Sequence, residues 1–321
     1  MVVMEKVVYS IEPISKDSSD LIEQELDCRY CYIERQNFSQ RTDIHGNISI
    51  LICRDRDAVS EIIDSCPSLK FLFIVSTGVE KLPFRKLLEH GIVVANTGGL
   101  NAPIMSEYAM AYILSRSDRV CENLKNQIKG IWKKFQCVDS LENKNLLIVG
   151  AGRTGRLLAQ KAKAFSMNVV GIKKHVSKQD YFDQVDSLEN IDSHLDKADF
   201  VVLTIPTTPE TKQMFNYERF RKMKKNAVFI NISRGALVNQ GELVKALKEK
   251  LIGCAILDVF EEEPLPPSSE MWQMDNLIIT PHSSGRLSNF MDQAIHCFVD
   301  NMKAFSINEP LPNKVDLNAG Y

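Results

Sequence analysis

Three residues whose side chains suit the reduction of a carbonyl group stand just after three short apolar stretches. Arg234 follows residues 230–233, Glu263 follows 258–260 and His282 follows 278–281. An arginine can hold a carboxylate in a fork and polarise the neighbouring carbonyl. A histidine can donate the proton that the carbonyl oxygen needs as hydride arrives, and a carboxylate on its other ring nitrogen favours the charged imidazolium. Each residue also has a purely structural interpretation. Arg234 could be a turn residue, Glu263 one of three surface acids, and His282 a loop histidine.

The stretches before these residues are predicted strands of one parallel sheet. Strands are expected at 199–205, 227–232, 255–259 and 277–280, with helices at 217–224 and 241–250. This alternation is typical of a doubly wound α/β fold. Because the carboxyl ends of parallel strands share one edge of the sheet, we expect Arg234, Glu263 and His282 to meet there.

A glycine-rich loop is predicted on the same edge. Four apolar residues at 146–149 precede Gly150, Gly152 and Gly155, which have the G-x-G-x-x-G spacing at the start of a helical pattern. A strand candidate at 168–172 completes a β-α-β unit. The pattern predicts that backbone N–H groups and the helix N-terminus bind the pyrophosphate of a dinucleotide. The alternative is a glycine-rich connection with no chemical role.

The residues after the second strand of this unit predict which cofactor binds. An NAD site usually has an acid there that accepts a hydrogen bond from the ribose 2′-hydroxyl, but this strand ends Ile172-Lys173-Lys174-His175. Lysines attract a 2′-phosphate that a carboxylate would repel. We therefore expect NADPH to be preferred and NADH to remain possible, unless the lysines merely face solvent.

The first part of the chain, residues 1–98, is predicted to form a smaller α/β unit. Strands are expected at 7–11, 48–53, 71–76 and 92–95, and helices at 19–26, 59–65 and 84–90. Two turns follow strands: Ser76-Thr77-Gly78-Val79 and Asn96-Thr97-Gly98-Gly99. Each turn is either a backbone site for a carboxylate or a plain glycine turn.

A long helix is expected after Asn101. Ile104, Tyr108, Tyr112, Val120, Leu124 and Ile128 recur at multiples of four residues and give one broad apolar face. The helix is expected either to bridge domains or pair with a second subunit, or else to pack within the core of one chain.

Composition excludes several classes of partner. A net charge of -2 and a pI near 6.3 provide no field for nucleic acid or an anionic membrane, and no apolar run is long enough to span a bilayer. A cytoplasmic protein with a small-molecule partner is expected. The pair Cys28 and Cys31 has no second pair to complete a zinc site, so no metal is predicted. The basic run at 219–225 is interpreted as a solvated helix face.

Three stretches resemble one enzyme family. The run 206–235, the stretch 257–266 (LDVFEEEPLP) and the stretch 280–285 (TPHSSG) resemble the D-isomer-specific 2-hydroxyacid dehydrogenases. Residues 313–321 are similar to the ends of the glyoxylate/hydroxypyruvate reductase branch. The resemblance implies a Rossmann-type nucleotide domain at 99–287 and a smaller flavodoxin-like α/β substrate domain at 1–98 and 288–321. It also implies a homodimer built on the nucleotide domains.

The resemblance also implies roles for individual residues. Arg234, Glu263 and His282 would be catalytic, and Asp258 would contact the nicotinamide amide. The stretch 75–79 resembles the loop that binds the substrate carboxylate, although Glu80 and Lys81 stand where the family has an aspartate. The predicted cofactor contacts are Gly150, Gly152, Arg153, Thr154, Gly155, Lys173, Lys174, Pro206 and Asp258, and the predicted substrate contacts are Thr77, Gly78, Val79 and Arg234.

The expected reaction is reduction of a short 2-keto acid, such as glyoxylate, hydroxypyruvate or pyruvate, to its D-2-hydroxy acid. A nucleotide-sensing binding protein on the same fold is the alternative from another class. Within the enzymes, a D-lactate or phosphoglycerate dehydrogenase is the nearer alternative.

Overall fold

The chain folds into two compact units, each with its own parallel sheet. The computed structural model describes residues 6–57, 59–134 and 137–320. Unit 1 comprises residues 1–100 and 287–321, and unit 2 comprises residues 101–286. These boundaries lie within two residues of those expected from the sequence.

The sheet of unit 1 has five parallel strands in the order β2-β1-β3-β4-β5. This order is the flavodoxin-like one, so the predicted fold of this unit is confirmed. Its strands are β1 (Val7–Ser10), β2 (Arg29–Tyr32), β3 (Ile50–Cys53), β4 (Phe71–Ile74) and β5 (Val93–Asn96). Strand β2 was not predicted, because its four residues are partly exposed and form no apolar run.

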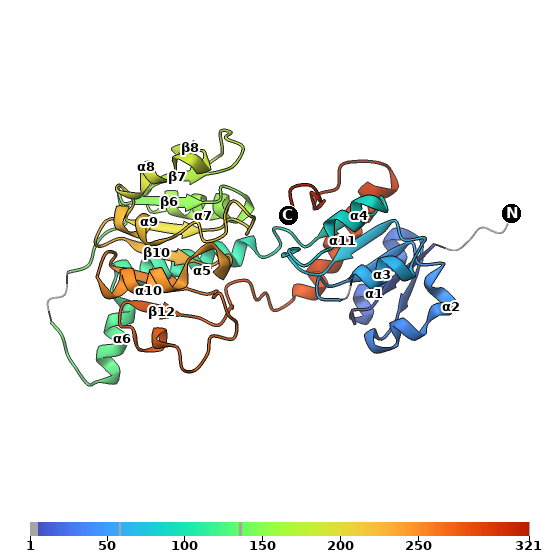
Figure 1. Ribbon diagram of the computed structural model, residues 1–321, viewed down its shortest axis with the longest axis horizontal. Coiled ribbons are helices and arrows are strands. Elements are labelled where there is room, and N and C mark those ends of the chain that lie inside the picture. Colours follow the sequence, from blue (N-terminus) through green and yellow to red (C-terminus); the bar gives the residue numbers. More distant parts are fainter. Residues whose placement is uncertain (1–5, 58, 135–136, 321) are drawn as a thin grey trace. The chain divides into compact units, whose positions relative to one another are not determined.

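Helices cover both faces of this sheet (Figure 1). They are α1 (Lys16–Leu26), α2 (Thr42–His45), α3 (Val59–Ser65), α4 (Phe84–Glu89) and α11 (Phe290–Ser306), with a 3-10 helix η1 (Arg35–Gln40). Helices α1 and α11 pack together and bury one face, while α3 and α4 bury the other. The last part of the chain therefore contributes a core helix to the first unit.

The sheet of unit 2 has seven parallel strands in the order β12-β11-β10-β9-β6-β7-β8. They are β6 (Asn145–Val149), β7 (Asn168–Ile172), β8 (Gln184–Asp186), β9 (Phe200–Leu203), β10 (Val228–Asn231), β11 (Cys254–Leu257) and β12 (Leu277–Ile279). The order reverses between β6 and β9, which makes a doubly wound Rossmann-type sheet, as predicted. Ligands of such sheets bind outside the carboxyl ends of the strands at this reversal.

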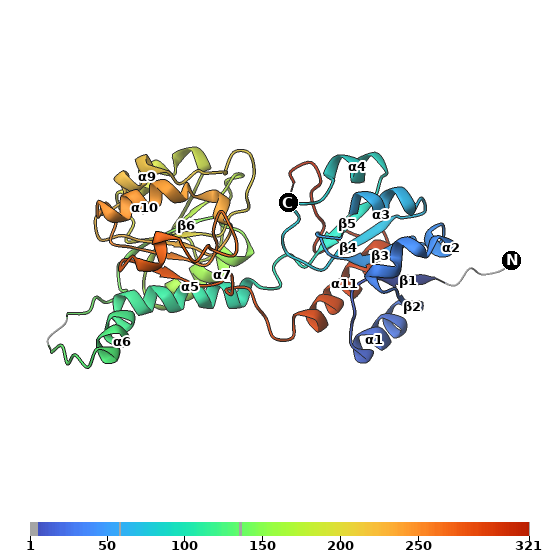
Figure 2. The same cartoon turned by 60° about the horizontal axis from the view of Figure 1, so that its bottom comes forward.

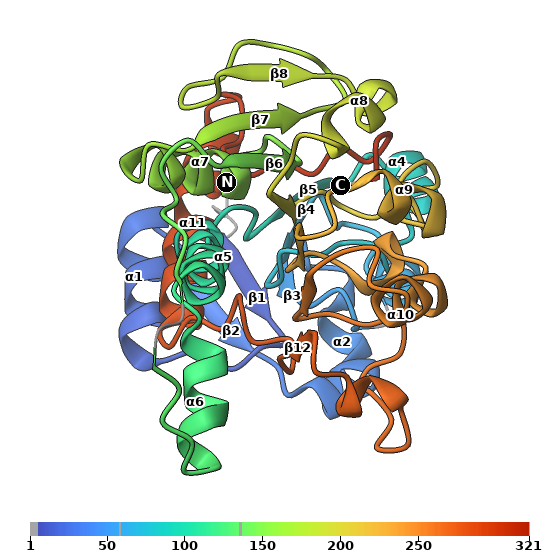
Figure 3. The same cartoon turned by 90° about the vertical axis from the view of Figure 1, so that its left-hand side faces the viewer.

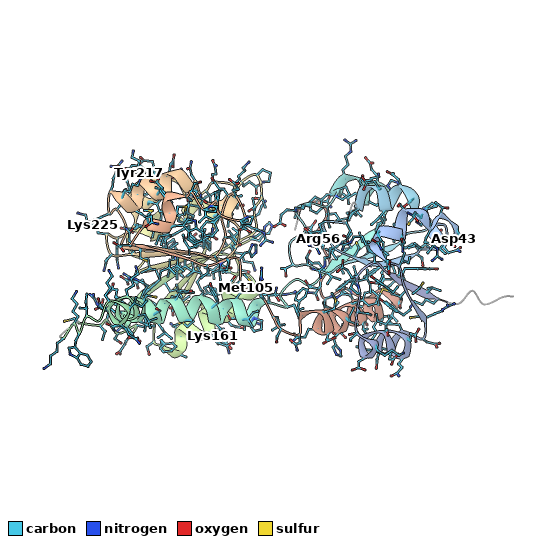
Figure 4. All side chains as sticks on the ribbon, turned by 90° about the horizontal axis from the view of Figure 1, so that it is seen from below. Asp43, Arg56, Met105, Lys161, Tyr217 and Lys225 are labelled. Atoms are coloured by element: carbon cyan, nitrogen blue, oxygen red, sulfur yellow. The ribbon has the colours of Figure 1, made fainter. Side chains whose placement is uncertain are left out.

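The helices of unit 2 lie on both faces of its sheet. They are α5 (Ala102–Ser117), α6 (Val120–Ile128), α7 (Arg153–Ala164), α8 (Asp192–Leu195), α9 (Tyr217–Lys222) and α10 (Gln240–Lys248), with 3-10 helices η2 (Leu188–Asn190), η3 (Gly235–Leu237) and η4 (Glu270–Gln273). Figure 3 shows α5 and α7 on one side of the strands and α8, α9 and α10 on the other. In Figure 4, Met105 and Lys161 mark the first face and Tyr217 and Lys225 the second.

The prediction of a single long helix after Asn101 is wrong, because the structure has two helices there. Helix α5 ends at Ser117, and Arg119 has a left-handed backbone (φ +54°) before α6 begins. The apolar periodicity runs on across the break, which is why the sequence did not reveal it. Helix α6 has no buried residue, so packing against the sheet does not hold it in line with α5. Figure 2 shows α6 projecting from the body of unit 2.

The basic run at 219–225 is largely neutralised within the fold. Arg219 and Lys222 both pair with Asp192, at 2.8 and 2.6 Å, and Lys224 pairs with Asp199 at 2.8 Å. These contacts agree with a solvated helix face rather than a phosphate-binding patch. None of the helices described here combines the length and the apolar character that crossing a membrane requires.

Candidate active site

His282 and Glu263 form a close pair at the carboxyl edge of the unit 2 sheet. His282 Nδ1 lies 2.7 Å from Glu263 Oε2, and the N–H of Phe260 donates to Glu263 Oε1 at 3.0 Å. His282 has a left-handed backbone (φ +49°) and donates its own N–H to the carbonyl of Asp258 at 2.8 Å. Its Nε2 makes no hydrogen bond within the described chain, and the side chain is 51% exposed. The ring is therefore held from one side and open on the other.

Asp258 anchors the segment that carries His282. Its Oδ1 accepts hydrogen bonds from Thr280 Oγ1 (2.7 Å) and the Ser283 N–H (2.8 Å), and Oδ2 accepts from the Ser284 N–H (2.9 Å). Burial of Asp258 opposes its ionisation, but these bonds outweigh burial and lower the pKa of its carboxyl. An ionised Asp258 thus fixes the turn between β12 and His282.

Arg234 lies at the end of the neighbouring strand β10. The buried side chain of Asn231 shapes its turn by accepting from the Ser233 N–H (3.1 Å) and donating to the Arg234 carbonyl (2.8 Å). A Cβ atom on Gly235 would lie 1.9 Å from the Phe260 carbonyl oxygen. Only glycine therefore lets the turn after Arg234 pack against the segment that leads to Glu263. Sequence reasoning missed Gly235, although its position directly after the arginine was a possible signal.

We predicted that the side chains of Arg234, Glu263 and His282 lie close together, and the structure shows part of this arrangement. The imidazole of His282 and the carboxylate of Glu263 are in contact, and the turn of Arg234 packs against Phe260, whose N–H holds Glu263. Strands β10, β11 and β12 are adjacent and parallel, so the three residues follow strand ends at one edge of the sheet.

The glycine loop between β6 and α7 has the shape that a diphosphate site requires. Gly150 has φ +115°, and a Cβ there would lie 2.6 Å from the backbone of Thr204. A Cβ on Gly155 would lie 2.2 Å from the Gly150 carbonyl oxygen, whereas one on Gly152 would meet nothing within 4 Å. Helix α7 begins next to this open position, and no side chain caps its N-terminus. The loop therefore leaves space and helix N–H groups for an anion.

The two lysines after β7 differ in their surroundings. Lys173 donates its backbone N–H to the carbonyl of Asp186 on β8 at 2.9 Å, and Lys174 Nζ pairs with the exposed Glu210 at 3.1 Å. The Asp186 carboxylate accepts from Asn190 (2.8 Å) and lies 3.0 Å from His194 Nε2. These contacts, with one from the Ser187 N–H, lower the pKa of Asp186 to about 2. An acid is thus present beside this strand end, but its side chain is already engaged.

Pro206 lies in the loop after β9, beside the glycine loop. Thr204 Oγ1 donates to the Gly150 carbonyl at 2.8 Å, and Thr211 Oγ1 donates to the Pro206 carbonyl at 2.8 Å. The Oγ1 of Thr207 is buried without a hydrogen-bond partner within the residues described. The loop is thus braced from both sides and retains one unsatisfied polar atom.

In unit 1, the turn from Ser76 to Val79 has bound carbonyls and spare N–H groups. The carbonyl of Thr77 accepts from Asn96 Nδ2 at 3.0 Å, and that of Gly78 accepts from Ser76 Oγ at 2.7 Å. Within the described part of the chain, the N–H groups of Thr77, Gly78 and Val79 donate to no acceptor. Such a run of unpaired N–H groups fits an anion.

Comparison with known proteins relates these features to one family. A model of the NAD-binding domain of D-isomer-specific 2-hydroxyacid dehydrogenases matches residues 110–284. A glyoxylate reductase of Korarchaeum cryptofilum is 31% identical over 265 residues, which cover 80% of this chain and 79% of that protein. The crystal structure of a D-isomer-specific 2-hydroxyacid dehydrogenase family protein from Aeromonas salmonicida is 30% identical, with a TM-score of 0.80, over 98% of this chain and 99% of that one.

A further solved structure shares the fold. It is an NADPH-dependent glyoxylate/hydroxypyruvate reductase from Sinorhizobium meliloti, crystallised with NADP and sulfate. Its TM-score is 0.81 at 23% identity, over 99% of this chain and 100% of that one. The similarity therefore extends through both units of the chain.

Proposed function

Because this chain belongs to the D-isomer-specific 2-hydroxyacid dehydrogenase family, we propose that it reduces a short 2-keto acid to the D-2-hydroxy acid with NADH or NADPH. Relatives named glyoxylate reductase make glyoxylate the first substrate to test, followed by hydroxypyruvate and pyruvate. The observation that carries the proposal is the 2.7 Å contact between His282 and Glu263, on the sheet edge that also holds the glycine loop.

His282 is proposed to donate a proton to the carbonyl oxygen of the substrate through Nε2, the ring nitrogen opposite the one held by Glu263. The carboxylate of Glu263 stabilises the positive charge that the imidazole must carry before it can donate. The bound nicotinamide cofactor supplies the hydride. Glu263 therefore acts on the substrate through the ring of His282.

Arg234 is proposed to bind the carboxylate of the keto acid and to polarise the adjacent carbonyl. The turn of unit 1 that contains Thr77, Gly78 and Val79 is proposed to bind the same type of carboxylate through its N–H groups. Among the residues that the structure describes, those three N–H groups have no acceptor, which supports this assignment.

The cofactor is proposed to bind along the carboxyl edge of unit 2. Open space at Gly152 and the uncapped start of α7 suit a diphosphate, which Gly150, Gly152, Arg153, Thr154 and Gly155 would hold. Pro206 is proposed to contact the cofactor from the loop after β9. Asp258 is proposed to accept a hydrogen bond from the nicotinamide amide, in addition to those from Thr280 and Ser284, because the family resemblance implies this role.

NADPH is proposed as the preferred cofactor. Lys173 and Lys174 follow β7, and the carboxylate of Asp186 is turned toward Asn190 and His194. Measuring kcat/KM with both cofactors tests the preference, and a tenfold preference for NADH would refute it. A Lys173→Ala and Lys174→Ala double variant should lose the preference for NADPH while its kcat/KM with NADH stays close to that of the wild type.

The absorbance of NADPH at 340 nm distinguishes an enzyme from a nucleotide-sensing protein. Consumption of NADPH with glyoxylate, hydroxypyruvate or pyruvate supports the enzyme. Binding of NADPH without consumption across a wide panel of keto acids would support the sensor instead. The D-configuration of the product can be checked with a stereospecific lactate assay after reduction of pyruvate.

A homodimer is proposed, with the arm formed by α6 and the residues up to 134 as part of its interface. Val120, Leu124 and Ile128 lie four residues apart on α6, and Ile128 and Trp132 are 86% and 91% exposed. A second copy of this chain would remove these side chains from water. Sedimentation analysis should give a dimer for the wild type and a monomer for a variant with Ile128→Ser and Trp132→Ser. A monomeric wild type would refute the proposal.

A cytoplasmic location is proposed from the thiols. All eight cysteines are free, as expected of a chain in a reducing compartment. Cell fractionation would test this location directly.

A further inference from the structure

Asn96 connects the two glycine turns of unit 1. Its side-chain Nδ2 donates to the Thr77 carbonyl at 3.0 Å, and its Oδ1 accepts from the Gly98 N–H at 2.9 Å. Asn96 is only 8% exposed, so neither bond is readily replaced by water. The amide therefore fixes the turn that follows β4 to the turn that follows β5.

The turn after β5 uses the N–H groups of Thr97 and Gly98 within the fold. Besides the bond from Gly98 to Asn96, Thr97 donates its N–H to the Ser76 carbonyl at 3.4 Å. This turn thus supports its neighbour, and of the two turns singled out in the sequence it is the less suited to an anion. The turn after β5 thus binds the carbonyls of Ser76 and Thr77 in the turn after β4. It does not use the N–H groups of Thr77 and Gly78, which remain for a ligand.

A segment near the end of the chain supports Asn96 in turn. Asn96 donates its backbone N–H to the Asn313 carbonyl at 3.1 Å, and the Asn313 side chain donates to the Gly98 carbonyl. Asn313 donates its own N–H to Oδ1 of Asn301, a fully buried residue of α11, at 3.0 Å. The segment continues along β5, where Val315 donates to the Val94 carbonyl at 2.9 Å. Figure 2 shows this dark red segment beside β5.

These contacts form one uncharged series, from Asn301 in α11 through Asn313 and Asn96 to the Thr77 carbonyl. We propose that Asn96 is a positioning residue that orients the Thr77–Val79 turn for the substrate carboxylate, and that Asn313 holds Asn96 in place. The inference rests on the proposed function, since it needs that turn to bind a keto acid. It explains why residues more than 200 positions after the turn contribute to it: they determine which backbone groups of the turn are free.

The test replaces the donor of Asn96 and separates substrate binding from the chemical step. In Asn96→Asp the group facing the Thr77 carbonyl is an oxygen, and in Asn96→Ala no group reaches it. The loss of one buried hydrogen bond to the turn should raise the KM for glyoxylate about five- to tenfold. The kcat at saturating glyoxylate should change by less than about threefold, because binding energy lost equally from ground and transition states appears in KM. The Kd for NADPH should be unchanged.

A matched control and an independent probe accompany these variants. Ser68 Oγ donates to the Gly46 carbonyl at 2.6 Å at the opposite edge of the same sheet. This bond is exposed and lies away from the turn, so Ser68→Ala should leave KM unchanged. Oxamate, an unreactive analogue of a keto acid, should bind the NADPH complex of Asn96→Ala more weakly than that of the wild type. Asn313→Ala provides a second variant should Asn96→Ala not fold, and it should raise KM in the same direction.

The outcomes separate the inference from the proposed function. A wild type that reduces glyoxylate, together with unchanged KM and oxamate affinity in the folded variants, overturns the positioning role and leaves the activity standing. A fall in kcat with KM unchanged overturns it as well. A wild type that reduces no keto acid refutes the proposed function, and the inference with it.

Discussion

Replacing Glu263 by glutamine should slow reduction by about tenfold while leaving the site otherwise intact. The two atoms of the pair are 2.7 Å apart, and their side chains are 51% and 35% exposed. At that separation, Coulomb's law gives about 1.5 kcal/mol in a water-like dielectric, which suits a pair this exposed. Glutamine keeps an oxygen for the ring nitrogen but loses the charge. If the barrier to proton donation rises by about 1.5 kcal/mol when this attraction is lost, kcat falls roughly tenfold.

Two further variants give the upper and lower limits expected for the loss of kcat. His282→Gln removes the proposed proton donor. General acid catalysis typically contributes about 10²- to 10⁴-fold, so the kcat of this variant should fall by that much. Glu262→Gln makes the same charge change one residue earlier, at a carboxylate without a hydrogen bond or ion pair to any residue described, and should leave kcat unchanged.

The assay is the decrease in absorbance at 340 nm with saturating NADPH and glyoxylate at neutral pH and low salt. The Kd for NADPH should be the same in all four proteins, because none of the three side chains is assigned to the cofactor. Added salt should reduce the difference in kcat between Glu263→Gln and the wild type, because salt screens the attraction between two exposed charges. Equal kcat values for Glu263→Gln and Glu262→Gln would refute the reasoning.

Three further predictions concern the supports of the site. Gly155→Ala places a Cβ atom 2.2 Å from the Gly150 carbonyl and should raise the Kd for NADPH at least about fivefold, measured by fluorescence titration. Gly235→Ala, with its Cβ 1.9 Å from a neighbouring backbone oxygen, should lower kcat and Tm, whereas Gly241→Ala, whose nearest atom is 3.7 Å away, should do neither; equal behaviour of the two would contradict the packing argument. The pKa of Asp186 is about 2 in the fold against an ordinary 3.8, so its contribution to stability is present above about pH 4 and is lost as pH falls toward 2. Asp186→Asn should therefore lower Tm at pH 7 and match the wild type near pH 2, and a constant difference in Tm across that range would exclude this explanation.

The elements that were predicted closely are those buried by the sheet. Strand β7 has the predicted bounds, and the ends of β9, β10 and β11 lie within two residues of the predicted ends, because each is a nearly continuous apolar run buried from both sides. Strand β8 is only three residues long and no member is buried, so it carries no such signal. Helix α11 is amphipathic, and its place in unit 1 depends on the long-range packing of Phe298 against Phe71 and Phe73.

The contact between Glu263 and His282 could be predicted because it depends only on strand order and direction. Glu263 and His282 are 19 residues apart, and adjacent parallel strands bring the residues after them to one edge. The supports of the pair could not be predicted in this way. The buried amide of Asn231 and the Gly235 contact depend on the distance between two loops, which no local pattern in the sequence records.

The residues after β7 show why the choice of cofactor cannot be predicted by counting residues along the chain. It depends on which side chains lie close together in space. Counting from the glycine loop finds lysines and no acid at the end of β7, but the neighbouring strand places Asp186 one backbone hydrogen bond from Lys173. That carboxylate is already engaged by Asn190 and His194, from η2 and α8, and this engagement is the reason we do not assign it to a ribose hydroxyl. The proposed preference for a 2′-phosphate therefore rests on two polar side chains outside the β-α-β unit as well as on the lysines within it.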